Sequence, residues 1–105
     1  MRVIFTTCRS AEADALASRL VEERLVACAN LIPGVRSIFH WQGELCREEE
    51  VVVWMETSAE RVEAAIARLR ALHAYEVPKI LVLEPESCND DYRAWLASGV
   101  GAAAR

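Results

Sequence analysis

His73, Cys8 and Cys28 are the side chains in this sequence best suited to bind a soft metal ion. Imidazole and thiolate are the ligands that copper and zinc prefer, so these residues are candidate ligands if the fold brings them together. Structural roles compete with this interpretation. A histidine at the end of a helix can cap its last carbonyl groups, and a free cysteine commonly packs as a small apolar side chain. The residue types alone leave both roles open.

The remaining cysteines and the acidic residues suggest no second metal site. The four cysteines lie far apart without a CxxC pair, which argues against a zinc ribbon, a thioredoxin-type redox site and a dense disulfide framework. Successive strand residues point to opposite faces, so neighbouring carboxylates on one strand do not converge on a cation. We therefore expect a solvated hairpin tip from the acidic run Glu44, Glu48, Glu49 and Glu50.

Several classes of function are disfavoured by pattern and charge. The chain has no GxSxG, no HExxH and no glycine-rich phosphate loop, so we expect a protein that is not an enzyme. A formal net charge of -4 and a pI near 5.2, without a basic stripe, predict no nucleic-acid partner. No apolar run reaches the roughly 18 residues of a membrane span, and the N-terminus lacks a signal-peptide pattern. We expect a cytoplasmic protein.

The elements that would position these residues form one domain over residues 1–105. Hydrophobic periodicity predicts strands and helices in the order βαββαβ, followed by a short C-terminal helix. Their expected ranges are a strand at 3–7, a helix from 10 to about 25, hairpin strands from 26 to 57 around a turn at Gln42-Gly43, a helix ending at 72, a strand at 79–85 and a helix from about 90 to 97.

Local signals refine these elements. Ser10 is the expected cap of the first helix, and Thr57 with Glu60 forms a capping-box pattern before the second. Proline cannot donate to a central strand ladder, so Pro33-Gly34 predicts a bulge in the hairpin. The buried side of the terminal helix is expected to consist of Tyr92, Trp95 and Leu96.

This order is the ferredoxin-like arrangement of the α+β class, in which both main helices cover one face of the sheet. The strands do not alternate apolar and polar residues as half-exposed strands would: VVVWM and ILVL are continuous apolar runs. Another copy of the chain is the simplest cover for the second face, and burying about 800 Å² per subunit would give about 20 kcal/mol before association costs. The alternative is a long hairpin that curls over its own sheet.

The chain also resembles a known family over almost its whole length. Four segments closely resemble the CutA (CutA1) divalent-cation tolerance proteins, in order and at matching spacing: ACANLIPGVRSIFHWQGEL, EVVVWMETS, HAYEVPKILVL and DYRAWL. The resemblance implies a ferredoxin-like subunit and a homotrimer whose sheets face inward, an architecture shared with PII signalling proteins. It also implies tolerance to copper and other divalent cations.

The resemblance further implies a pocket at the clefts between subunits. Its expected residues are Asn30, Trp41, Glu56, Tyr75 and Glu76. An aromatic wall with a few polar groups is typical of a small-ligand pocket, but buried Tyr, Trp and Asn side chains in an interface also need one another as hydrogen-bond partners. Both interpretations stay open.

At three positions the sequence departs from the pattern common in the family, and these departures change the charge near the expected site. Ala74 replaces a proline, Glu56 replaces a lysine and Lys79 replaces a glutamate. The leading hypothesis is a homotrimer that binds copper or other divalent cations. The alternatives are a PII-like trimeric sensor of a metabolite or nucleotide, against which the short Gln42-Gly43 turn argues, and a scaffold for partner docking.

Overall fold

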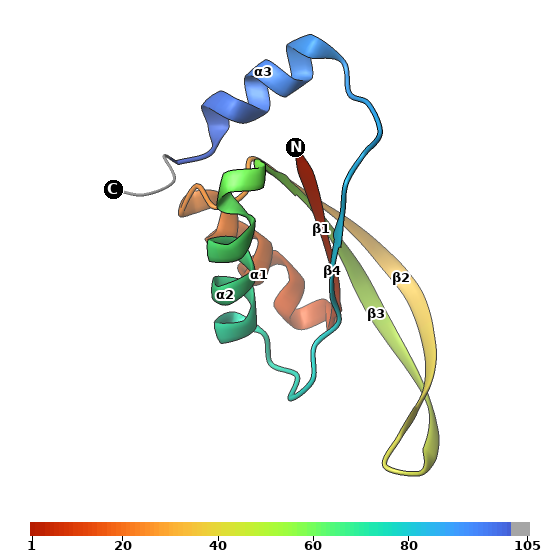
Figure 1. Cartoon of the computed structure of the whole chain (residues 1–105). Coiled ribbons are helices and arrows are strands. Elements are labelled where there is room, and N and C mark those ends of the chain that lie inside the picture. The colour runs from red at the N-terminus through yellow and green to blue at the C-terminus, as the bar shows by residue number, and fades with distance from the viewer. Residues whose placement is uncertain (102–105) are drawn as a thin grey trace.

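The chain forms four strands and three α-helices within residues 1–101, the part that this computed structural model describes (Figure 1). The order is βαββαβα, as the sequence predicts, with a single 3-10 turn at Ala59–Arg61 before the second helix. The elements are β1 (Arg2–Cys8), α1 (Ser10–Glu22), β2 (Cys28–Trp41), β3 (Glu44–Thr57), α2 (Val62–Leu72), β4 (Ile80–Leu83) and α3 (Asp90–Gly99).

The strands form one antiparallel sheet in the order β2-β3-β1-β4. Helices α1 and α2 lie side by side against one face of this sheet, and α3 lies across one end of it (Figure 1). This arrangement confirms the ferredoxin-like α+β fold predicted from the order of elements. None of the helices in residues 1–101 combines the length and apolar character needed to cross a membrane.

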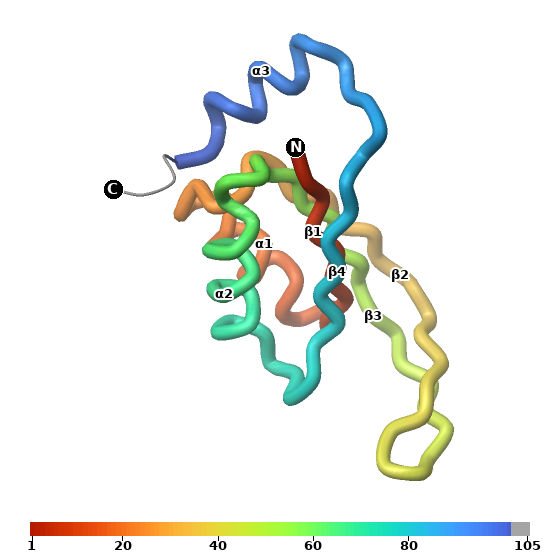
Figure 2. Tube along the Cα trace, viewed as in Figure 1, coloured from red at the N-terminus to blue at the C-terminus, as the bar shows by residue number. Residues whose placement is uncertain are grey.

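The β2–β3 hairpin extends beyond the rest of the molecule (Figure 2). With the hairpin included, the longest dimension of the molecule is 44 Å. Its turn uses left-handed backbone at Gln42 (φ 51°) and Gly43 (φ 82°), a conformation that glycine adopts without steric cost. The pairing register shifts between Ile32 and Val35, which confirms the bulge predicted at Pro33-Gly34.

The hydrophobic core lies between the sheet and the two main helices. Alternate residues of β3, Val53 and Met55, are fully buried there, together with Ile4 of β1, Leu20 of α1 and Leu69 of α2. These side chains are all apolar and touch one another in a single cluster. The buried residues of α1 (Ala13, Leu16, Ala17 and Leu20) and of α2 (Ala65 and Leu69) recur at helical spacing, so each helix buries one side.

The opposite face of the sheet keeps much of its apolar surface exposed in the single chain. Ile32, Leu81 and Leu83 are between 43% and 50% exposed, although residues of their type are normally buried. Helix α3 covers only one end of this face, where Leu96 is buried. The hairpin continues the sheet and does not fold back over it (Figure 2).

Three predictions about helix ends were wrong. Arg9, not Ser10, precedes α1 as its N-cap, and it makes no side-chain cap hydrogen bond. Helix α1 ends at Glu22 because Arg24 adopts left-handed backbone with φ 57°. The Thr57 hydroxyl donates to the Leu25 carbonyl, at 2.7 Å, instead of capping α2. On α3, the prediction that Trp95 is buried was also wrong, because half of its surface is exposed.

Candidate functional site

The fold brings two of the three predicted metal ligands together. Cys8, at the end of β1, and His73, directly after α2, line one small cavity of about 260 Å³ beside α1. Both side chains are buried, with exposed fractions of 1% and 9%. Glu12 of α1 lines the same cavity, and its Oε2 atom is buried without a hydrogen-bond partner. A thiol, an imidazole and a carboxylate therefore line one cavity.

Both ring nitrogens of His73 already have hydrogen-bond partners. The Tyr75 backbone N–H donates to Nδ1 at 3.1 Å, so the ring proton is assigned to Nε2. Nε2 lies 2.8 Å from the Thr7 carbonyl oxygen and donates to it. His73 thereby ties the end of α2 to β1, whereas the last carbonyl groups of α2 receive the His73 backbone N–H and not its ring. A metal ion would have to replace one of these two bonds.

The Cys8 thiol lies in an environment that favours its protonated form. Burial raises its pKa most, and the negative charges of Glu12 and Glu50 raise the pKa further. Metal ions bind the thiolate, so binding at Cys8 would have to displace the thiol proton.

Cys28 lies apart from this cavity. Strand β1 pairs with residues 51–57 of β3, and Cys8 is opposite Val51, at the first of these residues. Cys28 of β2 is opposite Glu56, near the last of them. The Cys28 thiol is 3.8 Å from Oδ1 of Asn30. Within residues 1–101, no three His, Cys, Asp or Glu side chains are grouped so that they could hold a metal ion. One chain therefore does not bring the three predicted ligands together.

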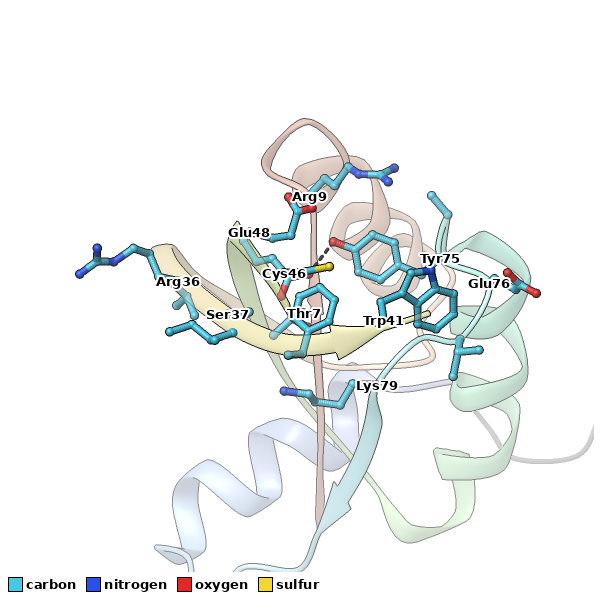
Figure 3. A pocket seen from close by; sticks show the side chains of 16 residues that line it. Thr7, Arg9, Arg36, Ser37, Trp41, Cys46, Glu48, Tyr75, Glu76 and Lys79 are labelled. Carbon is cyan, nitrogen blue, oxygen red and sulfur yellow. Dashed lines mark hydrogen bonds between the residues drawn. The ribbon is translucent and has the colours of Figure 1, made fainter. Parts of the chain in front are cut away.

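A larger cavity, of about 670 Å³, lies between the hairpin and the loop that joins α2 to β4 (Figure 3). Trp41, Tyr75 and Glu76, three of the five residues predicted for the pocket, line it. Ala74 and Lys79, which depart from the common family pattern, line it too. Two parts of the chain that the sequence singled out, the end of the hairpin and the loop before β4, thus lie on opposite sides of one cavity.

Glu50 is a buried acidic residue in the wall of this cavity. It was predicted to lie on the solvated hairpin tip, but it is only 5% exposed. Its carboxylate accepts a hydrogen bond from the Tyr75 hydroxyl at 2.5 Å (Figure 3). Burial, followed by this hydrogen bond, raises the pKa of Tyr75 well above its ordinary value. The signal that could have located Glu50 is its alternation with Val51 and Val53, which puts it on the face opposite the helices.

The other two predicted pocket residues, Asn30 and Glu56, lie on the exposed face of the sheet, in a separate group. The Glu56 carboxylate accepts hydrogen bonds from Nε1 of Trp54, at 2.8 Å, and from the hydroxyl of Tyr92 in α3. Burial and the bond to Glu56 raise the pKa of Tyr92. This group fits the hydrogen-bond-network alternative, and it fastens α3 to the sheet.

The sequence and the fold were compared with known proteins. A family model of the CutA1 divalent ion tolerance protein matches residues 2–99. The chain belongs to the CutA1 family. The CutA divalent-cation tolerance protein of Thermus thermophilus is 39% identical to it over 100 residues, covering 94% of this chain and 97% of the relative. The Escherichia coli CutA protein is 37% identical over 94 residues, covering 90% and 84%.

Solved CutA structures confirm the fold. The PII-like CutA protein of Nostoc in its apo form superposes with a TM-score of 0.92 at 34% identity, covering 96% of this chain and 98% of that one. CutA1 of Pyrococcus horikoshii superposes with a TM-score of 0.93 at 30% identity, covering 97% and 100%. The resemblance seen in the four sequence segments is thus confirmed for CutA membership and for the PII-like fold. These names also link the family to divalent cations.

Proposed function

We propose that this CutA-family protein is a homotrimer that binds copper or another divalent cation in the cytoplasm and has no catalytic activity. The observation that carries the metal-binding part is the cavity shared by Cys8 and His73. Sulfur and imidazole nitrogen suit copper or zinc better than calcium or magnesium. The family name supports a divalent cation as the ligand.

Cys8 and His73 are the proposed ligands in this cavity. On binding, Cys8 would give up its thiol proton and His73 would give up one of its two hydrogen bonds. Glu12 lines the same cavity, but within residues 1–101 it is not grouped with Cys8 and His73 closely enough to complete a set of three ligands. Cys28, which we also predicted as a ligand, would have to act at a separate position on the sheet.

The proposal of a trimer rests on the uncovered sheet face. Leu81 and Leu83 of β4 and Ile32 of β2 are each at least 43% exposed in a single chain. Small soluble proteins rarely leave a continuous apolar face in water, and closed symmetric assembly is the usual cover. Three copies with inward-facing sheets would bury these residues, the Glu56 group and Cys28 together.

Metal titration of the purified, metal-free assembly tests the cation-binding part. Calorimetry with Cu²⁺ or Zn²⁺, with Co²⁺ as an absorbance probe of thiolate coordination, should show saturable binding that both Cys8→Ser and His73→Gln weaken at least about tenfold. Cys46→Ser is the matched control, because Cys46 lies on the hairpin far from Cys8 in sequence and outside the small cavity. Absence of saturable binding in the unmodified protein would refute the metal-binding proposal.

A further inference from the structure

We propose that Tyr75 opposes metal binding at His73, so that binding in the small cavity is coupled to the wall of the larger cavity. This inference rests on the proposed cation binding and concerns its regulation. It assigns no new site, because the larger cavity is the one that the family resemblance places between subunits. It rests on three features: a wall segment that the two cavities share, the hydrogen bond on Nδ1 of His73, and the bond that holds the other end of Tyr75.

The two cavities share one short segment of wall, residues 73–75. His73 lines the small cavity, Tyr75 lines the larger one, and Ala74 lines both. The rings of His73 and Tyr75 are in contact, with their centres 4.8 Å apart and their planes tilted by 47°. A movement of this segment in one cavity therefore changes the wall of the other.

The backbone N–H of Tyr75 competes for the nitrogen of His73 that a metal ion would use. It donates to Nδ1 at 3.1 Å, which assigns the ring proton to Nε2. A metal ion binds the ring nitrogen without a proton, and a metal-bound histidine usually donates its other N–H to a carbonyl or carboxylate. The bond from Nε2 to the Thr7 carbonyl, of 2.8 Å, is of that kind. Binding at Nδ1 can therefore keep the Thr7 bond but has to displace the Tyr75 N–H.

The side chain of Tyr75 is held at its other end by Glu50. The hydroxyl donates to the Glu50 carboxylate at 2.5 Å, and Glu50 is only 5% exposed (Figure 3). A hydrogen bond to a charged acceptor is stronger than one between neutral groups, and a buried carboxylate that loses its donor is destabilised. The Arg9 guanidinium lies 5.2 Å from the centre of the Tyr75 ring and pairs at 3.9 Å with Glu12, which lines the small cavity. These contacts favour the position of Tyr75 in which its N–H occupies Nδ1.

The coupling has a definite sign. Displacing the Tyr75 N–H from Nδ1 requires the backbone at residue 75 to turn, and this movement pulls the hydroxyl away from Glu50. The unmodified protein therefore has to break the bond between Tyr75 and Glu50 when it binds a metal ion, and loss of that bond should strengthen metal binding. Because coupling between two sites is reciprocal, a bound metal ion should in turn release Tyr75 from Glu50 in the wall of the larger cavity.

Calorimetric titration of the assembled, metal-free protein with Zn²⁺ measures this sign. Tyr75→Phe keeps the ring and the backbone N–H but removes the bond to Glu50, so it should bind Zn²⁺ at least about fivefold more tightly than the unmodified protein does. Tyr92→Phe is the matched control, because the Tyr92 hydroxyl also donates to a carboxylate, that of Glu56, and Tyr92 lines neither cavity. The control should leave Zn²⁺ affinity unchanged. A variant that only damaged the fold would weaken binding.

Nuclear magnetic resonance observes the release of Tyr75 without any variant. The chain contains two tyrosines, Tyr75 and Tyr92, so ¹³C labelling of the tyrosine Cζ atoms, which carry the hydroxyls, gives one signal for each. Both hydroxyls donate to carboxylates in the metal-free protein. Saturation with Zn²⁺ should shift the Cζ signal of Tyr75 and leave that of Tyr92 in place.

The possible outcomes separate this proposal from cation binding itself. Zinc binding that depends on Cys8 and His73, but is no tighter in Tyr75→Phe or leaves the Tyr75 Cζ signal unshifted, would overturn the role of Tyr75 and leave cation binding intact. If neither the unmodified protein nor Tyr75→Phe binds Zn²⁺, both proposals fail. Zinc binding by Tyr75→Phe alone would refute cation binding by the unmodified protein and support the opposing role of Tyr75.

Discussion

Replacing His73 with alanine separates its structural role from its proposed role as a metal ligand. The imidazole donates to the Thr7 carbonyl and accepts from the Tyr75 N–H, at 2.8 and 3.1 Å, and the side chain is 9% exposed. His73→Ala removes both bonds and leaves the Thr7 carbonyl with the longer bond from the Thr6 hydroxyl, at 3.4 Å. We therefore expect a loss of unfolding free energy even when no metal is present.

The size of this loss follows from its parts. Each hydrogen bond contributes about 1 kcal/mol net, and removing the buried ring adds about 1 kcal/mol of lost apolar burial. The expected loss is about 2–4 kcal/mol, which would be a large fraction of the stability of a domain of this size.

Urea unfolding in the presence of a chelator measures this difference. Protomer concentration must be held equal, because assembly makes stability depend on concentration. His40→Ala is the matched control, since His40 is exposed on β2 and should change stability by less than about 0.5 kcal/mol. If metal-free His73→Ala is as stable as the unmodified protein, the two hydrogen bonds of the His73 ring are not made in solution.

Four further outcomes follow from the described contacts and backbone geometry. Thr57→Val should cost about 1–3 kcal/mol in urea unfolding, because the buried Leu25 carbonyl loses its donor; a neutral result would mean that this bond is not made. Cys8 should react with iodoacetamide more slowly than Cys46 at pH 8, because its pKa is raised; equal rates by mass spectrometry would contradict this. For the same reason its contribution to stability is complete below the ordinary cysteine pKa of 9.0 and is lost as pH rises through the higher pKa of the folded state. Gly43→Ala should lower the thermal midpoint, at a cost of about 1 kcal/mol, because Gly43 has φ 82°; an unchanged midpoint would show that the turn adapts.

The order of elements could be predicted from the sequence because the hydrophobic periodicity and the positions of turn-forming residues agree along most of the chain. Helical periodicity placed both main helices, and the Pro33-Gly34 and Gln42-Gly43 pairs placed the bulge and the turn of the hairpin. These are local signals, which depend on the conformations that individual residues allow. Family membership could be predicted as well, because four separate segments agreed.

The contacts of individual polar side chains were harder to predict, because they depend on tertiary neighbours. Thr57 forms a capping-box pattern with Glu60 in the sequence, but its hydroxyl donates instead to the carbonyl of Leu25, from another part of the chain. Glu50 belongs to an acidic run that was expected to be solvated, yet it is buried in the wall of the larger cavity. Cys8 and Cys28 were grouped by chemical type alone, and the sheet register separates them. Long-range register has no local signal in one sequence.

The central claim is that one chain leaves an apolar sheet face that further copies must cover. Native mass spectrometry at submicromolar protomer concentration, with circular dichroism on the same sample, tests it most directly. We expect a folded assembly of three chains, each of 11.7 kDa, and no folded single chain. A folded, stable 11.7 kDa monomer under these conditions would contradict the claim.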